Sequence, residues 1–258
     1  MKWITAVLAL LLLHQPAWAQ DSEARAREII DEAARRTAGF QDFTANLTMT
    51  IRDADGAGRD HEMQVQVLEV PEDGQRTLLT FDRANVRGMM ILTIANRDGR
   101  RRQYVYLPST RSTREVATSR QSESFMGSDF TYRDMGAQDF HGYTYEYLGE
   151  ETVGQVSCHK LERRPTDDGS GYDHQVVWLD TEAYRVLRVD YFDGANELLK
   201  TLELDGYQQY AGRHWRPDRM VMTDSRSGKS TTLAWSEYSF ENGLTTADFD
   251  PRRLGRPR

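Results

Sequence analysis

Residues 43–51, FTANLTMTI, decide the fold of this chain. Apolar side chains occupy every second position from Phe43 to Ile51, and threonine or asparagine fills the positions between them. Because the side chains of a β-strand point alternately to its two faces, this pattern predicts a strand with one buried and one wet face. The pattern returns at Met63, Val65 and Val67 after a turn signal at residues 55–56. The two segments therefore predict a β-hairpin.

The residues before this hairpin follow a helical period instead. Five small or branched apolar residues have helical spacing, and charged residues occupy the other face. This pattern predicts an amphipathic helix over Ser22–Ala38, capped by Asp21 or Ser22 and ended by Gly39. The apolar face consists of Ala26, Ile29, Ile30, Ala33 and Ala34.

Strand and turn signals recur at hairpin spacing through the rest of the chain. No linker or change of composition divides them, so we expect one curved antiparallel sheet and a mainly β (α+β) fold. An open sheet must cover its apolar face, and the available cover is the first helix and the irregular segment 119–138. The further strands are expected at residues 76–82, 88–95, 102–107, 143–148, 156–161, 175–179, 185–192, 197–204, 215–223 and 230–240.

The first nineteen residues predict export of the chain. Lys2 precedes a short apolar run that is followed by Ala17, Trp18 and Ala19, the small-x-small pattern of a signal-peptide cleavage site. The apolar run is shorter than the roughly 20 residues that a membrane-spanning helix needs. We therefore expect a signal peptide at residues 1–19 and a single periplasmic domain at residues 20–258. Residue 20 is Gln and not Cys, so no lipidation is expected.

Composition excludes further classes of protein. The net charge of −7 argues against a nucleic-acid-binding protein. Cys158 is the only cysteine, so we expect no internal disulfide and a buried thiol in a strand. The histidines show no metal-binding spacing, and the sequence contains no convergent acid, base and nucleophile. We therefore expect no metal, no cofactor, no enzymatic activity and a monomeric protein.

A motif in the middle of the chain resembles a known family. Residues 104–135 read YVYLPSTRSTREVATSRQSESFMGSDFTYRDM. The spacing of Leu107, Pro108, Arg111 and Arg114, together with the block SFMGSDF at residues 124–130, is similar to that of the outer-membrane lipoprotein-sorting proteins, the LolA-like carriers. The late Trp215-Arg216-Pro217 is a weaker match.

This resemblance implies an incomplete antiparallel β-barrel closed by helices. It also implies a periplasmic carrier that shelters acyl chains of a lipid or lipoprotein in an apolar cavity for transfer toward the outer membrane. Partners would be the lipid or acylated lipoprotein cargo, an inner-membrane transporter and an outer-membrane acceptor. The alternative is a lipid-sensing or accessory module of a lipid transporter that moves no cargo itself.

The candidate cavity residues combine soft and aromatic side chains. Methionine adapts to varied acyl-chain shapes, but it equally fills an ordinary core, so both interpretations remain open. Phe125 and Phe130 either close the mouth of the cavity or plug the core. The candidates are Met49, Met89, Met90, Leu92, Phe125, Met126 and Phe130.

Basic residues gather in one part of the acidic chain. Residues 97–133 contain eight arginines and four carboxylates. We single out Arg111 and Arg114 as candidates for docking an anionic head group or an acidic partner, because guanidinium groups bind phosphate in a bidentate manner. A solvated sheet face is the alternative interpretation. The basic tail at residues 251–258 is expected to fray.

Overall fold

A single long sheet dominates the computed structural model, which describes residues 17–83, 86–136, 140–167 and 169–256. Most of the expected signal peptide, residues 1–16, lies outside the described residues. Helix α1 is Ala17–Thr37, and short 3-10 helices are Thr118–Arg120, Thr246–Phe249 and Pro251–Arg253. The strands are β1 (Asp42–Arg52), β2 (Gly58–Val70), β3 (Gly74–Phe81), β4 (Met90–Asn96), β5 (Arg101–Leu107), β6 (Ser112–Val116), β7 (Tyr143–Val153), β8 (Val156–Pro165), β9 (His174–Asp180), β10 (Val186–Phe192), β11 (Leu198–Asp205), β12 (Gln208–Tyr210), β13 (His214–Arg216), β14 (Arg219–Asp224) and β15 (Ser230–Phe240).

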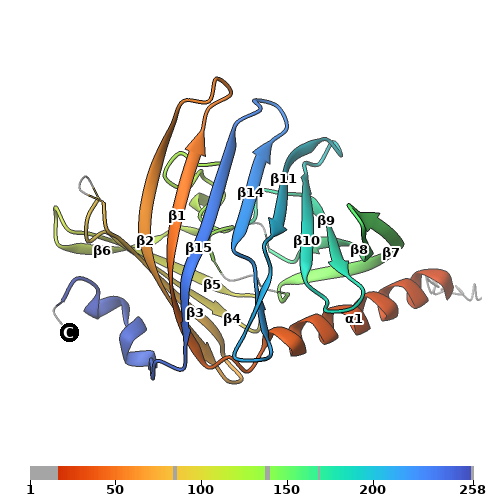
Figure 1. Cartoon of the computed structure of the whole chain (residues 1–258), viewed down its shortest axis with the longest axis horizontal. Helices are drawn as coiled ribbons and strands as arrows, with labels where there is room; N and C mark the ends of the chain where they lie inside the picture. Colours follow the sequence, from red (N-terminus) through yellow and green to blue (C-terminus); the bar gives the residue numbers. More distant parts are fainter. Residues whose placement is uncertain (1–16, 84–85, 137–139, 168, 257–258) are drawn as a thin grey trace, which may run out of the picture.

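The first and the last strand of the sheet pair with each other near its centre. Its thirteen strands follow the order β6-β5-β4-β3-β2-β1-β15-β14-β11-β10-β9-β8-β7, and all of the pairs are antiparallel. Strand β1 pairs with β15, with Leu47 opposite Trp235 and Met49 opposite Leu233. Figure 1 shows β2, β1, β15 and β14 side by side, with the remaining strands curving away on both sides. The edge strands β6 and β7 do not pair, so the barrel is incomplete, which confirms the predicted fold class.

Helix α1 covers the inner face at one end of the sheet. Its apolar side chains at Ala26, Ile29, Ile30 and Ala33 are buried in the main core, as the helical period predicted. The helix begins five residues before the expected start at Ser22. Ser22 therefore caps no helix end; instead its hydroxyl bonds the backbone N–H and C=O of Tyr147 on edge strand β7, at 3.0 and 2.9 Å. A strand edge that could pair with another chain is thus partly covered.

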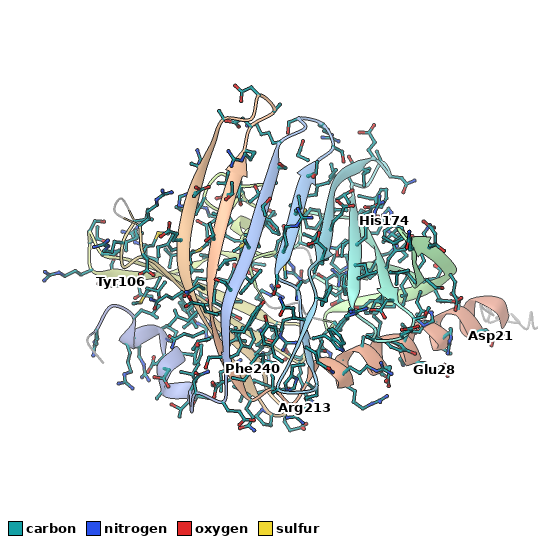
Figure 2. The ribbon with its side chains drawn as sticks, in the orientation of Figure 1. Asp21, Glu28, Tyr106, His174, Arg213 and Phe240 are labelled. Atoms are coloured by element: carbon teal, nitrogen blue, oxygen red, sulfur yellow. The ribbon has the colours of Figure 1, made fainter. Side chains whose placement is uncertain are left out.

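The C-terminal segment covers part of the outer face, where we had expected solvent. Phe249 and Leu254 are buried against Leu68, Leu78 and Leu92 on β2–β4. Tyr106 packs against the same cluster beside the C-terminal segment (Figure 2). Residues 251–256 therefore pack onto the sheet, and the expectation that the tail frays is wrong for them.

Most predicted strands lie within one or two residues of their observed bounds. The segment predicted as one strand at residues 215–223 is divided at Pro217 and Asp218 into β13 and β14, because proline lacks the N–H that a strand ladder needs. Cys158 is free and fully buried beside Val176 and Trp178, and burial raises the pKa of its thiol.

Candidate functional site

The inner face of the curved sheet encloses a cavity of about 560 Å³. Its walls include β1–β3 on one side, β8–β11 and β13–β15 on the other, and the C-terminal end of α1. The size lies within the roughly 300–1,000 Å³ of small-molecule sites. The apolar lining residues include Phe40, Phe43, Leu47, Val67, Leu79, Phe130, Met135, Val186, Val189, Leu202, Met220 and Leu233.

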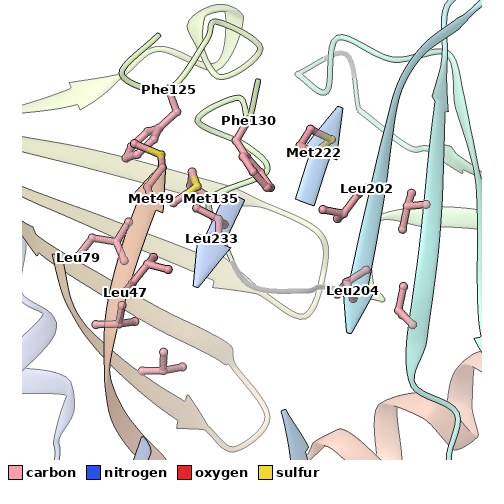
Figure 3. Close-up of a cluster of buried hydrophobic side chains, with 14 of the residues drawn as sticks. Leu47, Met49, Leu79, Phe125, Phe130, Met135, Leu202, Leu204, Met222 and Leu233 are labelled. Atoms are coloured by element: carbon pink, nitrogen blue, oxygen red, sulfur yellow. The ribbon is translucent and has the colours of Figure 1, made fainter. Parts of the chain in front are cut away.

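The strand period explains why these side chains meet. Leu47 and Met49 point inward from β1, and Leu233, their neighbour on β15, is 3% exposed. Leu202 and Leu204 point into the same core from β11. Figure 3 shows the two groups facing each other across the interior. Residues far apart in the sequence thus form one apolar surface.

An irregular segment, residues 117–136, lies over this interior and is called the cover segment below. Phe125 and Phe130 reach from it into the main core and are 0% and 2% exposed (Figure 3). The Phe125 ring lies 5.3 Å from that of Tyr132 at an interplanar angle of 80°. Phe130 lines the cavity, whereas Phe125 does not. Residues 137–138 of the predicted cover lie outside the described residues.

The cover segment is tied to the sheet by a buried ion pair. Asp134 Oδ2 accepts hydrogen bonds from Lys200 Nζ at 2.7 Å and from the Tyr172 hydroxyl at 2.9 Å. Lys200 Nζ also donates to the Asp129 carbonyl at 2.8 Å. Burial opposes ionisation of Asp134, but Lys200 and the hydrogen bonds from Thr131 outweigh it and hold the pKa of Asp134 below its usual range. The Asp134 carboxylate is therefore ionised at neutral pH.

The predicted methionines occupy different places. Met49 and Met89 are buried in the main core, and Met126 packs against it, but none of them lines the cavity. Met90 and Leu92 belong to the cluster on the outer face, under the C-terminal segment. The unbroken apolar run from Met89 to Leu92 thus serves both faces of β4, and the cavity role predicted for Met90 and Leu92 needs correction. Met135 and Met220 do line the cavity.

Polar groups also line the cavity, and sequence reasoning missed them. Burial raises the pKa of Tyr172, Tyr191, Tyr207 and Tyr238, so their hydroxyls are neutral. Arg163 and Arg216 lie in strands β8 and β13 and face the cavity. The available signal for Arg163 was its register, because it shares a strand face with the buried Leu161.

The predicted docking arginines lie away from the cavity. Arg111 has φ 48° in the turn before β6, and Arg114 lies on β6; both are exposed. The neighbouring carboxylates have other partners: Glu115 pairs with Arg102 at 2.9 Å, and Asp129 accepts a hydrogen bond from the Thr231 hydroxyl at 2.6 Å. The structure therefore leaves both arginines on the surface, and their docking role stays a prediction.

The described residues contain no cluster of three or more His, Cys, Asp and Glu side chains that could hold a metal ion. No helix within these ranges has the length and apolar character needed to cross a bilayer.

Comparisons with known proteins identify the class. A family model described as "Uncharacterized protein" matches residues 73–256. A domain described as an outer membrane lipoprotein-sorting protein domain, from Vibrio parahaemolyticus, is 35% identical, with a TM-score of 0.87 over 91% of this chain and 100% of its own. The chain belongs to the same family as this domain, the outer membrane lipoprotein-sorting proteins. None of the curated proteins matches it significantly in sequence.

Two more solved structures share the architecture. A DUF1329 family protein from Desulfovibrio piger is 29% identical, with a TM-score of 0.80 over 89% of this chain and 98% of its own. A LolA superfamily protein from Nitrosomonas europaea is 21% identical, with a TM-score of 0.70 over 87% and 97% of the two chains, and supports the fold alone.

Proposed function

We propose that this protein is a non-enzymatic periplasmic carrier that holds the acyl chains of a lipid or lipoprotein in its cavity for transfer toward the outer membrane. The observation that carries the proposal is the largely apolar cavity of about 560 Å³ beneath the cover segment. Exposing an acyl chain of about 16 carbons to water costs roughly 13 kcal/mol at about 0.8 kcal/mol per methylene. A cavity that recovers most of this free energy makes passage through water feasible.

The proposal includes the location and the organisation of the chain. The signal peptide at residues 1–19 delivers the protein to the periplasm, and residues 20–258 act as one carrier domain. Its partners are a membrane that donates the lipid, through a transporter, and an outer-membrane acceptor. Family membership and the related Vibrio domain support this reading.

Mass spectrometry of an organic extract of the purified protein tests for bound lipid. The sharper test fills the cavity by Met220→Trp, because Met220 is partly buried and lines the cavity wall. We expect this variant to remain folded and to bind a fluorescent fatty acid at least tenfold more weakly. Val221→Trp, on the opposite face of β14, is the matched control and should bind as the wild type does. Equal binding by the two variants would refute the cavity as the lipid site.

A transfer assay separates a carrier from the accessory module. Labelled lipid is placed in donor vesicles, and its arrival in acceptor vesicles is followed with and without the protein. A carrier accelerates exchange, and Met220→Trp should lose that acceleration. A protein that binds lipid but leaves the exchange rate unchanged is a sensing or accessory module instead.

A further inference from the structure

The wall of the cavity is basic, although the chain as a whole is acidic. Its described lining residues include eight arginines and only two carboxylates, Glu69 and Asp134. The whole chain has a net charge of −7. Burying a charged group is unfavourable unless it is paired, so a cavity for hydrocarbon alone gains nothing from this excess of guanidinium groups. The partners of these arginines therefore indicate which groups besides hydrocarbon the cavity can bind.

Several of these arginines already have protein partners. Arg133 pairs with Asp167 at 2.9 Å, and Arg185 pairs with Asp180 at 2.8 Å. Arg101 donates to the carbonyl of Arg133 at 2.7 Å. Ion pairs with Glu32 or Glu72 also hold Arg35, Arg36 and Arg97. Within the described part of the chain, Arg163 and Arg216 have no carboxylate at ion-pair distance.

Aromatic rings and a backbone carbonyl surround Arg216. Its guanidinium carbon lies 5.0 Å from the ring centroid of Phe40 and 5.5 Å from that of Phe43. Nη1 donates to the Trp215 carbonyl at 2.9 Å. Burial lowers the pKa of Arg216, and the nearby Tyr238, Tyr207 and Glu69 oppose this shift without reversing it. These contacts explain Arg216 as a packed side chain of the cavity floor.

Arg163 is surrounded by groups that can also bind an anion. Its Nε donates to Gln175 Oε1 at 2.6 Å, and its guanidinium carbon lies 4.4 Å from the ring centroid of Tyr143. Burial acts to lower the pKa of Arg163, but Tyr143, Tyr145 and Tyr191 around it, with a hydrogen bond from the guanidinium to Tyr145, outweigh burial and raise that pKa. Arg163 is therefore a cation among amide and phenol side chains. Amide and phenol groups beside a guanidinium suit the oxygens of a carboxylate or phosphate.

We propose that the cavity selects amphiphiles with an anionic carboxylate or phosphate head group, and that Arg163 is the counter-charge of this group. The inference rests on the proposed lipid-binding function and adds the class of cargo to it. An anionic head group supplies the missing partner of Arg163, while the acyl chain occupies the apolar wall. A neutral lipid of the same length leaves the guanidinium unpaired.

The test compares three probes that share one chain and differ in the head group. Palmitate, hexadecyl phosphate and hexadecanol are titrated into the delipidated protein in competition with a fluorescent fatty acid. We expect the wild type to bind at least one of the two anions tenfold or more tightly than the alcohol. Palmitate and hexadecyl phosphate together distinguish a carboxylate from a phosphate cargo.

Variants then assign the preference to Arg163. Arg163→Gln should lose at least tenfold in affinity for the preferred anion and less than twofold for hexadecanol, and Arg163→Lys should retain part of the preference. Arg219→Gln removes the same charge from an exposed side chain that pairs with Asp205 and should change neither affinity.

The outcomes separate this inference from the proposed function. Equal binding of all three probes by the wild type overturns the head-group preference and leaves the carrier proposal intact. No binding of any probe overturns the carrier proposal itself. An anion preference that survives in Arg163→Gln shows that another group is the counter-charge. If Arg163→Gln does not fold, the affinities of the wild type and of Arg163→Lys for the anions and for hexadecanol still decide whether Arg163 is the counter-charge.

Discussion

His214 shows how one buried side chain makes the stability of the fold depend on pH. It is 2% exposed, its ring stacks on Phe240 with centroids 5.5 Å apart, and its Nε2 accepts from Arg213 Nε at 3.0 Å. Phe240 and Arg213 lie close to each other at the lower end of the sheet in Figure 2. Burial, with Arg216 and Arg213 nearby, lowers the pKa of His214 from 6.5 to about 4. The imidazole is therefore neutral in the folded protein.

This lowered pKa predicts a loss of stability in mild acid. Between pH 6.5 and about 4 the unfolded chain binds a proton at His214 that the folded chain does not, so the free energy of unfolding falls as the pH falls through this range. At 1.36 kcal/mol per pKa unit the loss amounts to about 3 kcal/mol. His214→Phe keeps the ring stack and should flatten this slope in denaturant titrations. The same slope in the variant as in the wild type would contradict the assignment.

At the scale of elements, a buried ion pair between Asp134 and Lys200 helps to hold the cover segment on the sheet. Lys200→Met leaves the Asp134 carboxylate buried without its counter-charge, for which we expect a loss of about 3–5 kcal/mol in the free energy of unfolding. This loss arises because the Asp134 carboxylate stays buried without Lys200. The double variant Asp134→Leu with Lys200→Met buries no unpaired charge and should therefore recover much of the lost free energy of unfolding. Chemical denaturation of the single and double variants measures both effects. Additive losses would show that the two side chains act independently.

The same pair predicts an acid limit for the cover segment. The pKa of Asp134 is below its ordinary value, so its stabilising contribution is complete above that value, near pH 4, and is lost as the pH falls through the lower, folded-state pKa. We expect amide exchange in residues 129–135 to accelerate below pH 4, before exchange in β1 and β15 does. Simultaneous exchange of all three would contradict a locally held cover.

At the scale of the whole molecule, local patterns predict elements but not their partners. The alternation at residues 43–51 predicts β1 within one residue at each end. Strand β6 was missed because its five side chains are exposed or half-exposed and carry no apolar alternation. The pairing of β1 with β15 joins distant parts of the chain, so no local pattern encodes it.

The residues of the cavity likewise depend on tertiary contacts that no local pattern encodes. Phe130 could be predicted because it belongs to a recognisable motif. Arg163 is a single arginine in an ordinary strand, and only the tertiary structure shows that it faces the cavity. The cavity role predicted for Met90 and Leu92 needs correction because both lie on the outer face of β4, which the C-terminal segment buries. An apolar residue on a strand can therefore face either a cavity or a second core, and only the tertiary structure decides.

The last prediction concerns the contact between the start of β1 and residues 242–244, which follow β15. Asp42, at the start of β1, is 3% exposed and accepts hydrogen bonds from the backbone N–H groups of Asn242, Gly243 and Leu244 at 2.7, 3.0 and 3.2 Å. Asp42→Ala leaves these donors without their acceptor, so we expect a loss of about 3 kcal/mol in the free energy of unfolding. Amide exchange at residues 242–244 should accelerate with it.

Asp55→Ala is the matched control for this prediction. Asp55 also accepts a backbone hydrogen bond, from Ala57 N at 3.1 Å, but it does so within one exposed hairpin. We expect a loss of less than about 1 kcal/mol there, because water replaces the lost acceptor. If Asp42→Ala were no more costly than Asp55→Ala, the junction of β1 with the C-terminal segment would not hold the two ends of the chain together. The larger loss at Asp42 follows from its burial and from the three backbone N–H donors that converge on one carboxylate.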